Sequence, residues 1–279
     1  MHILLQLHPQ AITAEFLQQQ VHPQLEKLGF THEKLPLQLT PDTQPPKGDF
    51  VVALGGDGTF LAGARAAAQL GIPVIGLEMG RLGFLCQLPV DRLPEVLRLI
   101  KHGDYSIERR RVLACDYSLR EAGSHQGAIA VNDVVMGKGE LTRLVSISVL
   151  VDGEHLGTFK ADGVIVASAT GSTAYSLSVG GPLVEPELAL ILISPIAAHT
   201  LYTKPFVISG EREVELRPEQ EEPRVELSLD GLIVGRVREK DEVRVRLREE
   251  PLQVARLPAP SFFRMLRDKL GWGFAFREE

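Results

Sequence analysis

The chain has 279 residues, of which 44% are hydrophobic and 24% are charged. These proportions are those of a packed globular protein and exclude long disordered, collagen-like and coiled-coil architectures, while the length favours one large or two medium domains. The formal net charge of −6 provides no overall field that attracts nucleic acid or an anionic membrane surface, so we expect neither as a partner. The two cysteines, Cys86 and Cys115, are too few for a disulfide scaffold, and we interpret them as reduced core thiols.

The amino-terminal segment has neither the basic start nor the long apolar run of a signal peptide. The most apolar later stretch, residues 188–198, is interrupted by Ser194 and Pro195. It is far shorter than the ~20 residues that span a bilayer, so we expect a buried strand there. Both observations favour a cytoplasmic protein.

The first part of the chain alternates short apolar runs with helical patterns. The apolar runs are residues 3–7, 50–54 and 74–77, and the helical patterns are residues 14–28, 60–70 and 93–100. This alternation is typical of βαβ units, and strands that are apolar on both sides of the pleat are covered by helices on both faces. We predict an α/β domain with an open, mostly parallel sheet over residues 1–104.

From about residue 105 the pattern changes to a period of two, as in residues 144–151 and 242–247. Such alternation predicts strands with one buried face. Asp152-Gly153 and Asp230-Gly231 lie between alternating runs and predict tight hairpins. We predict a β-rich, sandwich-like second domain over residues 105–254. A final helix is predicted from the capping Ser261 to the stop at Gly271.

A glycine-rich segment joins a buried strand to an alanine-rich helix. Gly55, Gly56 and Gly58, with Thr59, leave backbone amides bare at a helix N-terminus, which predicts a phosphate loop. Leu61 stands where a dinucleotide fingerprint has its third glycine, and no Walker sequence occurs, so the loop is of another kind.

Asp57 is the single carboxylate of this loop, and we expect it to point into the phosphate crevice. A carboxylate repels phosphate unless it holds a divalent cation or accepts the proton of an attacking hydroxyl. The alternative is that Asp57 only caps the helix. We expect Mg²⁺ to bridge the donor phosphates, because the chain has no concentrated cluster of basic residues to offset their charge; the sequence assigns no metal ligands.

Two further segments present polar groups after apolar runs. The strand at residues 163–167 leads into a turn dense in small hydroxyls and glycine, which suits a ribose or a carboxamide, although a plain Ser/Thr-rich turn is the alternative. Asn132-Asp133 follows residues 129–131 and is either an Asx turn or a grip on adenine and ribose edges.

These segments together resemble the NAD kinase family. Residues 55–59 match its signature, which lipid kinases and phosphofructokinases share more loosely. Residues 80–85, 131–135 and 162–182 match further family motifs in the same order, and residues 269–273 also follow the pattern. The resemblance covers nearly the whole chain.

The resemblance implies transfer of the terminal phosphoryl of ATP or polyphosphate to the 2′-hydroxyl of the adenosine ribose of NAD, with Asp57 as proton acceptor. Gly58, Asn132 and Asp133 are then NAD ligands, and Phe84 lines the adenine pocket. The other implied nucleotide contacts are Arg143, Lys160, Asp162, Thr170, Thr173, Ala174, Tyr175, Ser176, Leu177 and Ser178. The resemblance also implies a homodimer or homotetramer, and a terminal segment, residues 255–279, that returns to the first domain.

Two positions depart from the family pattern. Glu78 stands where we expect Asn, and Leu232 stands where Gln is frequent. Glu78 changes the local charge and is a candidate to assist metal binding, whereas Leu232 puts in doubt a contribution of its hairpin to the ligand.

Other functions remain open at this point. A lipid kinase needs an apolar entry surface, and a sugar kinase needs several basic residues that we cannot place. A non-catalytic NAD sensor needs the binding motifs without the acid, so the presence of Asp57 favours catalysis.

Overall fold

The structure is a computed structural model that describes residues 1–36, 45–80, 83–86, 88–139, 143–199, 203–219, 225–257 and 261–271. Parts of two quoted motifs, at residues 81–82 and 272–273, lie outside these ranges. The chain folds into two compact units. Of the described residues, unit 1 comprises those within 1–36, 45–108 and 253–271, and unit 2 comprises those within 109–252.

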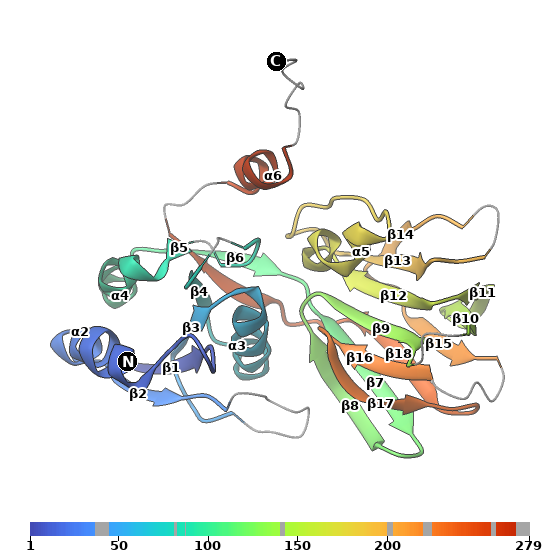
Figure 1. Cartoon of the computed structure of the whole chain (residues 1–279), viewed down its shortest axis with the longest axis horizontal. Coiled ribbons are helices and arrows are strands. Elements are labelled where there is room, and N and C mark those ends of the chain that lie inside the picture. The colour runs from blue at the N-terminus through green and yellow to red at the C-terminus, as the bar shows by residue number, and fades with distance from the viewer. Residues whose placement is uncertain are drawn as a thin grey trace. The chain divides into compact units, whose positions relative to one another are not determined.

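Unit 1 is built on one sheet with strand order β2-β1-β3-β4-β19-β6, in which β5 pairs with β4 (Figure 1). Its strands are β1 (His2–Leu7), β2 (Thr31–Lys34), β3 (Phe50–Gly55), β4 (Val74–Glu78), β5 (Leu88–Pro89), β6 (Ser106–Arg110) and β19 (Leu252–Arg256). Its helical segments are α1 (Ala14–Phe16), the π-helical η1 (Leu17–Val21), α2 (His22–Lys27), α3 (Asp57–Leu70), η2 (Val90–Arg92), α4 (Leu93–His102) and α6 (Phe262–Leu270). The pairs of β1 with β2, β1 with β3, β3 with β4, β4 with β5 and β4 with β19 are parallel, which confirms the predicted sheet.

Helices cover both faces of this sheet. Buried side chains of β1 and β3 on one face form a cluster with those of α2 and α4, as the apolar runs predict. The other face meets α3 at very short range, because Gly63 has no side chain. A Cβ added there would lie 3.1 Å from Gln6 Cβ and 3.2 Å from Val51 Cγ1.

The predicted terminal helix is confirmed as α6. The Ser261 hydroxyl accepts a hydrogen bond from the Arg264 amide at 3.3 Å, and Gly271 ends the helix with a φ of 62°. Lys269 of this helix places Nζ 5.0 Å from the centroid of the Phe84 ring. The C-terminal helix therefore returns to the first domain.

Unit 2 contains two six-stranded sheets, with orders β11-β10-β15-β18-β7-β8 and β14-β13-β12-β9-β16-β17. Their strands are β7 (Leu113–Leu119), β8 (Gly123–Ala130), β9 (Asp133–Lys138), β10 (Val145–Val151), β11 (Glu154–Ala161), β12 (Gly163–Ser168), β13 (Leu190–Ile196), β14 (Phe206–Ser209), β15 (Val214–Pro218), β16 (Val225–Leu229), β17 (Leu232–Val237) and β18 (Glu242–Leu247). Two short helices, η3 (Thr170–Thr173) and α5 (Tyr175–Ser178), follow β12. Apolar side chains of both sheets share one core, which confirms the β-rich, sandwich-like prediction.

Both predicted hairpins are present. Asp152 and Gly153 have φ values of 49° and 79°, and Asp230 and Gly231 have values of 48° and 78°. These left-handed conformations match the twist of the paired strands, β10 with β11 and β16 with β17.

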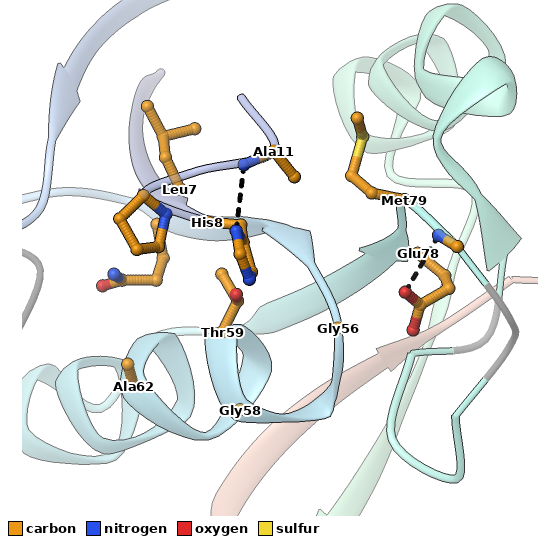
Figure 2. Close-up of a pocket in the computed structure, with 12 residues that line it drawn as sticks. Leu7, His8, Ala11, Gly56, Gly58, Thr59, Ala62, Glu78 and Met79 are labelled. Atoms are coloured by element: carbon orange, nitrogen blue, oxygen red, sulfur yellow. Dashed lines mark hydrogen bonds between the residues drawn. The ribbon is translucent and has the colours of Figure 1, made fainter. Parts of the chain in front are cut away.

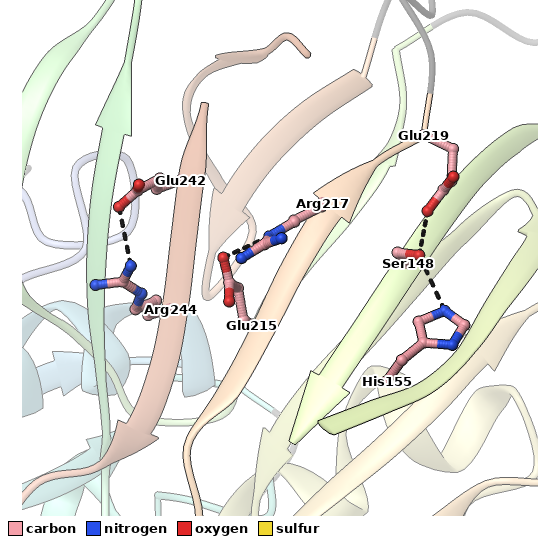
Figure 3. Close-up of polar contacts among 7 residues, drawn as sticks. All are labelled: Ser148, His155, Glu215, Arg217, Glu219, Glu242 and Arg244. Carbon is pink, nitrogen blue, oxygen red and sulfur yellow. Dashed lines mark hydrogen bonds and ion pairs between the residues drawn. The ribbon is translucent and has the colours of Figure 1, made fainter. Parts of the chain in front are cut away.

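The first sheet of unit 2 carries polar contacts on the side away from the core (Figure 3). Arg217 Nε lies 2.6 Å from Glu215 Oε1, and Arg244 Nη2 lies 3.1 Å from Glu242 Oε2. The second pair is exposed, and such pairs each contribute about 0–1 kcal/mol, so the apolar core provides most of the stability. Within the described parts of the chain, no helix is long and apolar enough to cross a membrane.

Because α3 approaches its sheet closely at Gly63, we predict that a larger side chain at this position destabilises the protein. Gly63→Val should lower the free energy of unfolding by about 1–3 kcal/mol, because the added methyl groups have to displace Gln6 and Val51. Denaturant unfolding measures this loss. Gln69→Val, on the exposed side of the same helix, controls for the effect of a β-branched residue; equal losses in the two variants would contradict the packing argument.

Candidate functional site

The glycine loop leaves space for a ligand at the start of α3. Gly56 is the N-cap residue and provides no side-chain cap, so the amides of the first turn have no partner within the helix. A Cβ added to Gly58 would meet nothing within 4 Å, and one added to Gly56 would meet only Glu78, at 3.5 Å and beyond. Neither glycine is needed for packing, which is the arrangement expected where a phosphate approaches the main chain.

Asp57 is held by the turn at residues 84–86. Its Oδ2 accepts a hydrogen bond from the Phe84 amide at 2.9 Å, and its Oδ1 accepts from the amides of Leu85 and Cys86 at 3.0 and 3.2 Å. These three donors fix the direction of the carboxylate. The capping alternative is wrong, since Gly56 occupies the cap position.

Gly83 allows the carboxylate to take this position. A Cβ added there would overlap the carboxyl group of Asp57. With about four acceptor positions on a carboxylate and three in use, one position on Oδ2 remains for a hydroxyl or a cation.

Glu78 and Cys86 share the surroundings of Asp57. One ligand atom from each of the three side chains lies within 4.8 Å of the other two. Burial raises the pKa of the Cys86 thiol, and the charges of Asp57 and Glu78 raise it further, so the sulfur stays protonated and donates to the Gly55 carbonyl at 3.8 Å. Two carboxylates and no thiolate form a set of hard oxygen donors, which suits Mg²⁺.

Lys269 of α6 brings a positive charge to the same place. Its Nζ lies over the Phe84 ring. Burial lowers the pKa of the ammonium, while Asp57 and Glu78 oppose that shift. The lysine thus offsets part of the negative charge beside the loop.

A cavity of about 500 Å³ lies along the loop (Figure 2). Its polar lining comes from the end of β1, from the start of α3 and from the end of β4, namely Gln6, His8, Thr59 and Glu78. The volume lies within the range of about 300–1,000 Å³ that small-molecule sites occupy.

A second set of predicted residues meets in unit 2. Asp230, at the tip of the β16–β17 hairpin, accepts hydrogen bonds from the amides of Val131, Asn132 and Asp133 at 3.0, 2.7 and 3.3 Å. The hairpin thereby fixes the corner that carries Asn132 and Asp133. Burial, and then the charge of Asp230, raise the pKa of Asp133 to about 7.

The turn after β12 packs against this corner. Ser168 Oγ donates to the Val131 carbonyl at 2.7 Å, and a Cβ at Gly171 would overlap the Asn132 carbonyl. Asn132 Oδ1 and Thr170 Oγ1 are buried without a hydrogen-bond partner. Unpartnered polar atoms are costly inside a protein, so a ligand that binds both is favoured here.

Other predicted residues have different surroundings. Ser176 is buried and pairs with the Ser194 hydroxyl at 2.9 Å, Thr173 donates to the Thr170 carbonyl at 3.2 Å, and Asp162 pairs with Lys138 Nζ at 2.5 Å. The side chains of Ala174 and Leu177 are half-buried, and those of Tyr175, Ser178, Arg143 and Lys160 are exposed.

The structure thus gathers predicted residues into two sets, one in each unit. Sequence reasoning included Gly83 only as part of a family motif and assigned it no role, and it recognised Asp230 only as a hairpin residue. His8 and Gln6 were also missed, although their position at the carboxyl end of a parallel strand was a usable signal.

Models of the ATP-NAD kinase N-terminal and C-terminal domains match residues 5–105 and 131–257. The NAD kinase of Gemmatimonas aurantiaca is 41% identical over 231 residues, which are 83% of this chain and 80% of that protein. The NAD kinase of Magnetococcus marinus is 40% identical over 224 residues, 80% of this chain and 74% of that protein.

Two solved structures share the fold. Yeast NADH kinase complexed with NADH has a TM-score of 0.81 at 24% identity, and the match covers 100% of this chain and 90% of that one. An NAD kinase from Archaeoglobus fulgidus in complex with ATP has a TM-score of 0.74 at 24% identity, with 97% and 98% coverage.

The raised pKa of Asp133 predicts a dependence of stability on pH. The protonated carboxyl stabilises the fold below its unfolded pKa of about 4, and this stabilisation is lost as the pH rises through about 7. The melting temperature of Asp133→Asn, minus that of the unmodified protein, should therefore increase from about pH 5 to about pH 8. Asp91→Asn, at an exposed position, is the control; a difference for Asp133→Asn that does not change with pH would refute the prediction.

Proposed function

The chain belongs to the ATP-NAD kinase family and has its activity, the phosphorylation of NAD to NADP, and from this premise we propose that Asp57 is the residue that accepts the proton of the attacking hydroxyl. Family membership sets aside the lipid kinase, the sugar kinase and the non-catalytic sensor. The observation that carries the proposal is the anchored Asp57 carboxylate, which keeps one acceptor position open beside the phosphate loop.

The proton transfer makes modest demands on Asp57. In a loose phosphoryl-transfer transition state the alcohol loses its proton late, so the position of the carboxylate matters more than its basicity. The three amides hold both oxygens, and the open position on Oδ2 is where the 2′-hydroxyl of the NAD adenosine ribose would donate. The bare amides of Gly58 and Thr59, together with the small Gly55 and Gly56, would receive the transferred phosphoryl group.

We assign the divalent cation, Mg²⁺, to Glu78, because the one open position of Asp57 is taken by the hydroxyl. The carboxylate oxygens of Glu78 are hard ligands, and one of them lies within 4.8 Å of an Asp57 oxygen. The cation would neutralise charge on the donor phosphates. Glu78 stands where the family pattern has Asn. This difference would strengthen the cation site, because a carboxylate binds the cation more strongly than the amide of Asn.

Unit 2 would hold the NAD. We propose that the unpartnered oxygens of Asn132 and Thr170 and the carboxyl of Asp133 bind its adenosine portion. With a pKa of about 7, a large fraction of Asp133 is protonated at neutral pH and can donate a hydrogen bond as well as accept one. Arg143, Lys160, Asp162 and the segment from Thr173 to Ser178 are proposed as further contacts on the family resemblance alone.

We further propose a cytoplasmic homodimer or homotetramer. Two features support this proposal: Cys86 and Cys115 are buried free thiols, and Tyr175, Leu188 and Val207 are 44–48% exposed in unit 2. ATP is the donor in the family description, and polyphosphate is proposed as a second substrate.

Replacement of Asp57 tests the proton-transfer role. Asp57→Asn should leave the Kd for NAD within a few-fold but reduce kcat by 10²-fold or more, since the amide of Asn is a far poorer proton acceptor. Calorimetric binding and NADP formation measure the two quantities. Asp91→Asn is the matched control at an exposed site. Near-full turnover in Asp57→Asn would exclude the role.

Replacement of Glu78 tests the cation site. Glu78→Gln keeps an oxygen that can accept the Gly80 amide hydrogen bond, which is 3.1 Å long, but removes the charge. The Mg²⁺ concentration for half-maximal activity should rise about 10-fold, with kcat largely recovered at saturating Mg²⁺. Glu26→Gln, on the exposed side of α2, should leave it unchanged. An unchanged Mg²⁺ requirement in Glu78→Gln would remove Glu78 from the site.

A further inference from the structure

The cavity beside the glycine loop contains two polar side chains from the end of β1 that the family motifs do not include. Gln6 and His8 both line it, and Asp57 is not among the described residues that do so. The Asp57 carboxylate is instead turned to the amides of residues 84–86. In an in-line transfer the attacking hydroxyl and the leaving group lie on opposite sides of phosphorus. We place the attacking hydroxyl beside Asp57. The cavity is therefore suited to the leaving group, which is the remainder of the phosphoryl donor.

His8 has a defined tautomer. Its Nδ1 accepts hydrogen bonds from the amides of Gln10 at 3.2 Å and Ala11 at 3.0 Å, so the proton of the neutral ring is on Nε2. In Figure 2 the ring extends from the Ala11 side of the cavity toward Thr59, at the start of α3. His8 therefore presents an N–H donor next to the bare amides of that helix. A phosphate chain held by those amides would find a second donor in this N–H group.

Gln6 presents a hydrogen-bond acceptor, whereas His8 presents a donor. Its side chain is 1% exposed, and its Oε1 has no hydrogen-bond partner. A buried acceptor without a donor costs about 1–3 kcal/mol, so a ligand that supplies a hydrogen here gains affinity. Swapping the amide oxygen and nitrogen would not remove the requirement for a polar partner.

We propose that this cavity binds the phosphoryl donor as a nucleoside triphosphate, with His8 as a phosphate ligand and Gln6 as a ligand for a hydroxyl or amino group of the nucleoside. The inference rests on the proposed function and refines it. A nucleoside triphosphate carries both anionic oxygens for His8 and hydrogen-bond donors for Gln6. Inorganic polyphosphate carries only the former, and its binding leaves Gln6 unpartnered. Gln6 thereby makes the cavity favour ATP over polyphosphate.

Kinetics with the two donors separate these roles. Gln6→Met, which keeps the length of the side chain without its amide, should raise KM for ATP about 5-fold or more while the value for polyphosphate changes less than about two-fold. If the unmodified protein does not use polyphosphate as a substrate, the inhibition constant of polyphosphate against ATP is measured in place of its KM. His8→Ala should raise both values about 10-fold, and His8→Gln, which retains an N–H donor, should recover part of the loss. Neither change should alter KM for NAD.

Exposed residues provide the matched controls, Gln20→Met and His102→Ala, and melting temperatures verify that each variant folds. An equal effect of Gln6→Met on ATP and polyphosphate, or no effect on either, would overturn the role of Gln6. A rise in KM for NAD in place of ATP would assign the cavity to the acceptor and overturn the proposal. If no preparation phosphorylates NAD, the proposed function fails, and calorimetric binding of ATP to the unmodified protein and to Gln6→Met still decides the inference.

Discussion

The hydrogen bonds from the turn at residues 84–86 to the Asp57 carboxylate are the interaction on which the site in unit 1 depends. They join the first residue of α3 to a segment 27–29 positions later in the chain. Hydrogen bonds to a charged group contribute about 1.5–3 kcal/mol each, so the carboxylate has little freedom to turn away. The same bonds hold Phe84 in place, and Phe84 in turn lies under Lys269 of the terminal helix.

Opposite charges are balanced around this anchor. Glu78 adds a second carboxylate, and Lys269 supplies an ammonium group whose pKa these acids raise against the effect of burial. In unit 2 the two neighbouring carboxylates, Asp133 and Asp230, differ in their surroundings. Asp230 is bound by three amides, whereas Asp133 has no comparable set of donors and its pKa rises to about 7. Backbone amides thus bind one carboxylate of the pair, while burial and the charge of its neighbour set the pKa of the other.

The sequence was sufficient to predict the two domains and many of their elements. Apolar runs located β1, β3 and β4, period-two alternation located β10 and β18, and Ser261 with Gly271 located the ends of α6. The direction of the Asp57 side chain could not be predicted, because it depends on amides that approach only after the chain has folded. The reach of Asp230 to residues 131–133 depends likewise on strand register. Gln6 belongs to an apolar run in which nothing indicates an unpartnered oxygen.

Cys86 lies beside the glycine loop, close to Asp57 and Glu78, yet it is 0% exposed. Thiol oxidation and alkylation proceed through the thiolate, and here burial and two neighbouring carboxylates suppress that form. The neutral, enclosed sulfur is therefore a poor target for oxidants and alkylating reagents.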